Sequence, residues 1–94
     1  MRVLGKQWLE QLSKEHADAR SAVESWLALA EAATWRTPHE LKQWDPKASL
    51  VGGSIAIFNN RNNRYRLEAM IDYRNSIVRV RWAGDHSEYD RRRY

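Results

Sequence analysis

The segment GDHSEYD, residues 84–90, concentrates side chains that can exchange protons shortly before the closing RRRY. It contains His86, Glu88 and Tyr89 together with two aspartates. Histidine titrates near neutral pH and can donate or accept a proton, as general acid–base catalysis requires. Tyr89 follows His86 by three residues, so their side chains share a face if the segment turns helically. We interpret His86 and Tyr89 as a candidate acid–base pair; the alternative is a solvated tail.

Arginine supplies a second kind of chemistry, and it is concentrated in the second half of the chain. The net charge is +4. Residues 1–47 hold equal numbers of basic and acidic side chains, whereas residues 48–94 hold nine arginines, no lysine and five acidic residues. The guanidinium is a planar fork of donors that suits phosphate. The pattern favours a polyanionic partner, most often nucleic acid, over an ordinary basic surface.

Composition excludes several other classes of protein. The 94 residues are 43% hydrophobic and contain no cysteine, which predicts one folded domain, residues 1–94, without disulfides or a cysteine metal site. No apolar run is long enough for a signal peptide or a membrane span, so we expect a cytoplasmic protein with no membrane contact. Common catalytic motifs are absent, and three scattered histidines predict neither a metal site nor a cofactor. We interpret His16 and His39 as surface residues.

The first half of the sequence has helical periodicity. A first short helix is predicted around Trp8, Leu9 and Leu12. A second is predicted from about residue 18 to 34, with an apolar stripe at helical spacing. That stripe consists of Ala19, Val23, Trp26, Leu27, Ala30 and Ala33. A third should run from Pro38 to Trp44, because Thr37 and Glu40 form a capping box around a proline in its favoured first position.

The second half changes to a period of two. Residues 51–54 interrupt regular structure and precede a predicted strand at 55–59. Apolar and polar side chains then alternate over residues 64–73 and 76–82, which predicts two strands joined by a turn at Arg74–Asn75. The register that keeps apolar residues on one face pairs Ile71 with Val78, Leu67 with Trp82, Glu68 with Arg81, and Arg66 with Ala83. The face left open by the core then carries Arg64, Arg66, Arg79 and Arg81.

These patterns together predict an α+β fold, a small antiparallel sheet with N-terminal helices packed on one face. The initial MRVL can add an edge strand. Asn62 in the loop NNRNN is expected at positive φ, and the length of that loop decides whether Ile57 or Phe58 points inward. The sequence leaves both choices open.

Four segments, taken in order, resemble the HigB family of toxins, within the RelE-like superfamily of type II toxin–antitoxin systems. They are MRVLGK, ASLVGGSIAIFN, NNRYRLEAMIDY and IVRVRWAGDHSEYD, so the resemblance covers nearly the whole chain. It implies the fold predicted above and an mRNA interferase, an endoribonuclease that cuts messages, usually on translating ribosomes. The implied partner is a HigA-like helix-turn-helix antitoxin, which blocks the toxin and alone contacts the operator DNA.

The family's functional positions fall on matching residues. The arginine of YRL is Arg66, and the terminal histidine and tyrosine of H-x-E-Y-D are His86 and Tyr89. Departures from the family pattern are Asp85 in place of threonine, Arg64 in place of lysine and Asn62 in place of a turn glycine. None of them removes a proposed catalytic group.

The expected chemistry needs no metal. The ribose 2′-OH attacks the adjacent phosphorus, and a fixed guanidinium stabilises the charge that builds on the phosphoryl oxygens, with Arg66 the first candidate and Arg81 the second. His86 is expected to be the general acid, and Glu88 either the base or a capping residue. Residues expected to hold RNA backbone are Arg64, Arg79, Arg81, Arg91 and Arg92. The alternatives are an RNA- or ribosome-binding module without chemistry and a protein-interaction surface for an acidic antitoxin segment.

Overall fold

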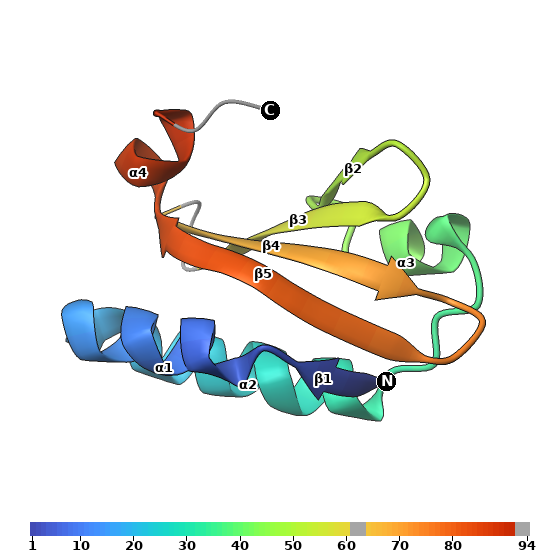
Figure 1. Cartoon of the computed structure of the whole chain (residues 1–94), viewed down its shortest axis with the longest axis horizontal. Coiled ribbons are helices and arrows are strands. Elements are labelled where there is room, and N and C mark those ends of the chain that lie inside the picture. Colours follow the sequence, from blue (N-terminus) through green and yellow to red (C-terminus); the bar gives the residue numbers. More distant parts are fainter. Residues whose placement is uncertain (61–63, 92–94) are drawn as a thin grey trace.

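The computed structural model describes residues 1–60 and 64–91. A five-stranded sheet in the order β1-β5-β4-β3-β2 forms its centre. Helices α1 and α2 cover one face of the sheet, and α4 lies at the end of β5 on the other side (Figure 1). The elements are β1 (Arg2–Leu4), α1 (Lys6–Glu15), the 3₁₀ turn η1 (Ala17–Ala19), α2 (Arg20–Ala32), α3 (Pro38–Trp44), β2 (Ser49–Val51), β3 (Ile55–Asn60), β4 (Tyr65–Asp72), β5 (Ile77–Asp85) and α4 (His86–Asp90). The predicted α+β fold, with helices on one face of a sheet, is confirmed.

The predicted helices are present with small differences at their ends. Helix α1 buries Leu9 and Leu12, and α2 buries Val23, Trp26 and Ala30 of the predicted stripe. The second helix is shorter than predicted, because the residues before Arg20 form the 3₁₀ turn η1. Helix α3 has the predicted bounds, and the Thr37 side chain accepts a hydrogen bond of 3.1 Å from the Glu40 amide.

Aromatic rings form the centre of the core between the helices and the sheet. The Phe58 side chain is fully buried, and its ring centroid lies 5.2 Å from that of Trp26 and 5.9 Å from that of Trp35. Asn60 pairs with Tyr65, and this register points Phe58 toward the helices. Ile57, opposite Glu68, points to the other face, which answers the question that the sequence left open. The position predicted for positive φ, residue 62, lies outside the described residues.

The β4–β5 hairpin follows the predicted register over only half its length. Ile71 pairs with Val78 as predicted, and Ala69 with Val80 in the same register, but a bulge between Glu68 and Ala69 follows. Beyond it Glu68 pairs with Trp82, Leu67 with Ala83 and Arg66 with Gly84, so the predicted pairs Leu67–Trp82, Glu68–Arg81 and Arg66–Ala83 are wrong. The bulge inserts Arg81 as one extra residue, which moves Trp82 to the face opposite the core.

The tip of this hairpin is fixed by a carboxylate. The Asp72 side chain accepts hydrogen bonds from the Asn75 side chain at 2.9 Å and from the Asn75 amide at 3.0 Å. These hydrogen bonds, the side-chain bond first, lower the pKa of the Asp72 carboxyl. Arg74 and Asn75 lie at the turn as predicted, and Ser76 adopts a left-handed φ of 58° to complete it.

Both edges of the sheet differ from the sequence prediction. The expected N-terminal edge strand exists, but β1 pairs in parallel with β5, so the sheet is mixed rather than wholly antiparallel. The prediction lacked β2, which pairs with β3 ahead of the turn that contains Gly52. A three-residue strand such as β2 carries too little alternation to be recognised in a sequence.

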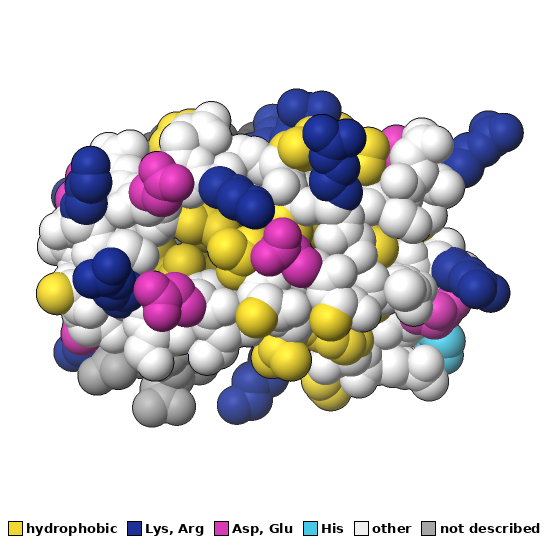
Figure 2. All heavy atoms as spheres, turned by 90° about the horizontal axis from the view of Figure 1, so that it is seen from below, with side chains coloured by type: hydrophobic (Ala, Val, Ile, Leu, Met, Phe, Trp, Pro, Cys, Tyr) yellow, Lys and Arg dark blue, Asp and Glu magenta, His cyan; other side chains and the backbone are white. Residues whose placement is uncertain are grey.

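The outer surface of α1 and α2 shows the balanced charge expected for the first half of the chain. Figure 2 shows basic and acidic side chains around an apolar hollow, which Leu9, Val23 and Leu27 line. Two ion pairs, Lys6–Glu31 and Arg20–Glu24, join charges of opposite sign on these helices. Among the described helices none is long and apolar enough to cross a membrane.

Replacing Gly5 with alanine is expected to destabilise the fold strongly. Gly5 links β1 to α1 at a φ of 81°, and a Cβ there would overlap the Val80 carbonyl oxygen. Both the left-handed conformation and the clash with backbone oppose the side chain, so the free energy of unfolding should fall by about 2–4 kcal/mol in denaturant titration. Gly53→Ala is the matched control, because a Cβ at that position meets no atom within 4 Å. Equal stability of the two variants would contradict this account of Gly5.

Candidate functional site

The candidate site forms where the first half of β4, the end of β5 and α4 meet. Arg66 on β4 pairs with Gly84 on β5. The guanidinium carbon of Arg66 lies 5.8 Å from the centroid of the Tyr89 ring on α4. This separation is within the range of a cation–π contact. The structure therefore brings together Arg66 and Tyr89, two of the three residues predicted to be catalytic.

An aromatic pair extends the site. The ring centroids of Trp82 and Tyr89 are 6.2 Å apart, with an interplanar angle of 43°. Gly84 permits the underlying packing, because a Cβ at that position would lie 2.5 Å from Trp82 Cζ2. Trp82 was predicted to lie on the core face of the hairpin, and no sequence pattern marked it as a site residue. The bulge that redirects it has no recognisable sequence pattern, although Gly84 marks the close approach.

Helix α4 carries both members of the predicted acid–base pair. It begins directly after β5, which extends through Gly84 to Asp85, three residues beyond the predicted end of the strand at residue 82. Asp85 and Glu88 form a reciprocal capping box: the Glu88 amide donates to Asp85 Oδ1 at 2.7 Å, and the Asp85 amide donates to Glu88 Oε1 at 3.2 Å. Of the roles considered for Glu88, capping is the one that the structure contains.

His86 is the first residue of α4 and lies near the surface. Its Nδ1 is 2.9 Å from Asp90 Oδ2, and 51% of its side chain is exposed. Its amide donates a 2.9 Å hydrogen bond to the Arg64 carbonyl, which attaches the start of α4 to the start of β4. The helical turn on which a shared face of His86 and Tyr89 depends is present. The imidazole is thus accessible to a large ligand and is oriented by one carboxylate.

The predicted arginine face is only partly realised. Arg79 and Arg81 are exposed, and Arg81 Nε lies 3.8 Å from Glu68 Oε2. Glu68, expected on an open face, is only 2% exposed, and Ile57 opposite it is equally buried. The middle of this face is therefore covered, and a buried carboxylate there is paired with arginine, as buried charge requires.

The remaining arginines have different surroundings. Arg64 does not share this face as predicted: its Nη1 donates a 2.8 Å hydrogen bond to Asp18 Oδ2 of η1, in the helical layer. Arg91 Nε donates to the Ser87 carbonyl at 3.2 Å and remains exposed at the end of α4. Arg92 lies outside the described residues.

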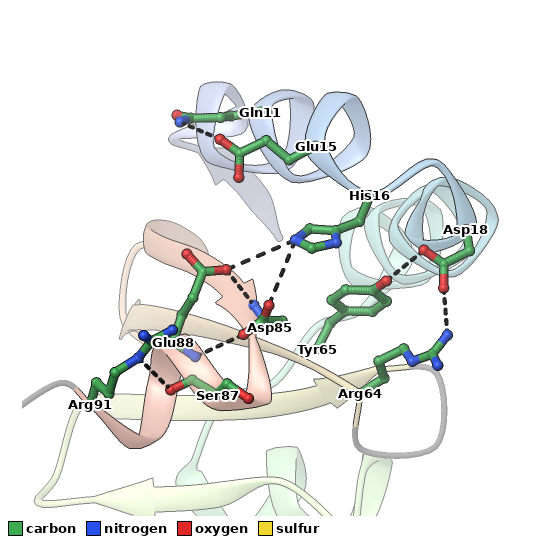
Figure 3. Close-up of polar contacts among 10 residues, drawn as sticks. All are labelled: Gln11, Glu15, His16, Asp18, Arg64, Tyr65, Asp85, Ser87, Glu88 and Arg91. Atoms are coloured by element: carbon green, nitrogen blue, oxygen red, sulfur yellow. Dashed lines mark hydrogen bonds and ion pairs between the residues drawn. The ribbon is translucent and has the colours of Figure 1, made fainter.

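His16, interpreted above as a surface residue, lies beside the start of α4. Its Nε2 is 3.9 Å from both Asp85 Oδ2 and Glu88 Oε1 (Figure 3). Glu15, His16 and Glu88 also bring potential metal-ligand atoms within 4.8 Å of one another. Of these, Glu15 accepts a hydrogen bond from Gln11, and Glu88 belongs to the capping box. His39, by contrast, is exposed on α3 as expected.

The mixed sheet with helices packed on one face is consistent with a RelE-like fold. A family model described as HigB toxin, RelE-like toxic component of a toxin-antitoxin system, matches residues 19–92. The chain therefore belongs to the HigB toxin family. Membership makes it the toxic component of a toxin–antitoxin system, which includes an antitoxin partner. A search of curated proteins gave no match.

Proposed function

We propose that the protein is an endoribonuclease that cleaves mRNA without a metal ion, on translating ribosomes. The observation that carries the proposal is the position of Arg66 beside Tyr89, on the helix that also carries His86. A cation able to bind phosphate and two groups able to transfer protons thus lie at one end of the sheet. When the 2′-OH of an RNA attacks the adjacent phosphate, cleavage requires both a cation that stabilises the phosphate and groups that transfer protons.

The proposed reaction is an in-line displacement within the RNA. The 2′-oxygen loses its proton and forms a bond to the adjacent phosphorus, while the bond to the 5′-oxygen of the next nucleotide breaks. The products are a 2′,3′-cyclic phosphate and a 5′-hydroxyl. We assign His86, starting as the imidazolium, as the general acid that protonates the leaving oxygen, and Tyr89, starting as the phenolate, as the group that accepts the 2′-OH proton.

Arg66 is the better of the two candidates for stabilising the phosphoryl oxygens. Arg81, the alternative, is the extra residue of the bulge and lies 3.8 Å from the buried Glu68 carboxylate. That carboxylate offsets part of its charge. Arg66 contacts the ring of Tyr89, so its guanidinium lies beside one of the proposed proton-transfer groups.

Further arginines are proposed to bind RNA backbone around this centre. The exposed arginines proposed for this role include Arg79, Arg81 and Arg91. Arg64 forms an ion pair with Asp18, which offsets part of its charge, so Arg64 should contribute least to RNA binding. The same role is proposed for Arg92. Because such contacts displace counterions, RNA or ribosome binding should weaken as salt rises.

The proposed setting follows from the toxin–antitoxin family. We propose a HigA-like helix-turn-helix antitoxin as the partner, with operator DNA bound only through it. A toxin that acts on translated messages works in the cytoplasm, where the ribosomes are. Induction of the toxin with and without the neighbouring gene product tests this pairing by growth and mRNA integrity.

Cleavage is expected to persist when divalent metal ions are chelated. In the proposed mechanism side chains alone transfer the protons and stabilise the charge. EDTA should therefore change the rate less than about twofold, within the scatter of such assays, on any free RNA that the protein cleaves. Ribosomal reactions need enough magnesium to keep the ribosomes intact. Gel analysis should show new 5′-hydroxyl ends. Binding of RNA without cleavage would favour the non-catalytic module, and cleavage restored only by a divalent ion in ribosome-free reactions would refute the metal-free mechanism.

A further inference from the structure

The arm formed by α4 is too short to hold its own position. It has five residues, none of them buried. Isolated helices of this length are unstable in water, because the few hydrogen bonds formed do not offset the conformational entropy lost in ordering the first turn. Tyr89 nevertheless has a defined place against Arg66 and Trp82. Contacts from outside the arm must therefore fix its direction.

His16 is placed to provide such a contact. It follows α1, and its Nε2 lies 3.9 Å from Asp85 Oδ2 and 3.9 Å from Glu88 Oε1. These carboxylates are the two members of the capping box at the start of α4. A protonated imidazole between them would relieve their mutual repulsion and attach the arm to the helical layer. With 28% of its side chain exposed, His16 is partly sheltered from solvent.

A second set of contacts holds the other side of the His16 ring. The centroids of the His16 and Tyr65 rings are 5.2 Å apart, at an interplanar angle of 54°. The Tyr65 hydroxyl donates a 2.5 Å hydrogen bond to Asp18 Oδ1, two residues beyond His16 in the sequence. Tyr65 also pairs with Asp85 across the sheet. Figure 3 shows that η1, the start of β4 and the start of α4 meet around this ring.

We infer that His16 is a positioning residue for the catalytic arm, acting through Asp85 and Glu88. It fixes the start of α4 so that Tyr89 projects toward Arg66. The inference rests on the proposed function, because the direction of the arm matters for activity only if α4 carries reacting groups. His16 lies outside residues 19–92, the segment matched by the toxin family.

The first test measures the arm directly, without cleavage. Three amide hydrogen bonds report its attachment: Asp85 to Glu88, Glu88 to Asp85, and His86 to Arg64. In His16→Gln these amides should exchange with deuterium about three- to tenfold faster, as expected on losing two partly exposed ion pairs. Amides in the middle of β4 should be unchanged, and His39→Gln is the matched control. Unchanged exchange at the three amides in His16→Gln would overturn the inference.

The charge partners provide a coupling test. Glu88→Gln keeps a side chain that completes a capping box but removes one negative charge. In that background His16→Gln should accelerate exchange less than it does in the parent protein, because one of the two ion pairs is already lost. Equal acceleration in both backgrounds would show that His16 does not act through Glu88. EDTA should leave the parent exchange rates unchanged; a loss of protection would show that a metal, not the imidazolium, joins these groups.

The last test separates this inference from the proposed nuclease activity. His16→Gln should lower kcat for RNA cleavage about three- to tenfold with little change in KM, because the arginines that hold RNA are untouched. Faster amide exchange together with an inactive parent protein would support the attachment of the arm and refute the proposed function. A parent protein that cleaves RNA, with an unchanged kcat in His16→Gln, would refute a positioning role even if exchange rises.

Discussion

Tyr89→Phe is expected to lower RNA cleavage by about 10²–10⁴-fold, the usual contribution of a general acid–base group. The substitution removes one oxygen and leaves the ring in place. Its contacts with Arg66 at 5.8 Å and with Trp82 at 6.2 Å depend on the ring and not on the hydroxyl. The free energy of unfolding should therefore change by no more than about 1 kcal/mol. The measurement is single-turnover cleavage beside a melting curve.

Tyr73→Phe is the matched control for this hydroxyl deletion. Tyr73 lies beyond the other end of β4, and partial burial raises the pKa of its hydroxyl. Loss of the Tyr73 hydroxyl should leave the rate of RNA cleavage unchanged. If Tyr89→Phe cleaves as fast as the parent protein, Tyr89 packs against the site without transferring a proton.

His86→Ala is expected to cause a loss of similar size, since His86 is the proposed general acid. The ring is half exposed and paired with Asp90, so the fold should lose little stability when it is removed. His39→Ala on α3 controls for the loss of a surface histidine. Full cleavage by both His86→Ala and Tyr89→Phe would mean that residues 84–90 are not the acid–base part of the site.

Arg66→Ala is expected to abolish toxicity in growing cells and to lower cleavage by about 10²–10³-fold, as the loss of one fixed donor to a developing oxyanion does. The side chain lies off the core face, and its cation–π contact with Tyr89 is worth about 0.5–1 kcal/mol, so the protein should remain folded. Growth after induction and cleavage at matched protein levels provide the measurements.

Two further variants sharpen the assignment of Arg66. Arg66→Lys keeps the charge but loses the planar fork, so it should recover only part of the activity. Arg79→Ala removes an exposed arginine from the sheet face opposite α1 and α2, and should weaken RNA or ribosome binding while cleavage at saturation persists. Full toxicity of Arg66→Ala would instead favour Arg81 as the group that stabilises the phosphoryl oxygens.

The sequence by itself determined the elements and the chemistry available to them. Helix α3 was predicted to the residue because its cap and proline act within one turn. The apolar stripe of α2 and the alternation of β4 specified which faces would be buried. His86, Tyr89 and Arg66 were recognisable because residue type and spacing are local properties. The parallel pairing of β1 with β5 and the presence of the short strand β2 could not be predicted from such local patterns.

Only the tertiary structure decided how these residues meet. One extra residue at the Glu68–Ala69 bulge turned Trp82 out of the core and toward Tyr89, and hairpin periodicity cannot predict a bulge. The pairing of Arg64 with Asp18, and the place of His16 beside Asp85, join segments far apart in the chain. Contacts of that kind depend on how the helical layer packs on the sheet. Packing is the sum of many small interactions over the whole molecule, so no local pattern encodes it.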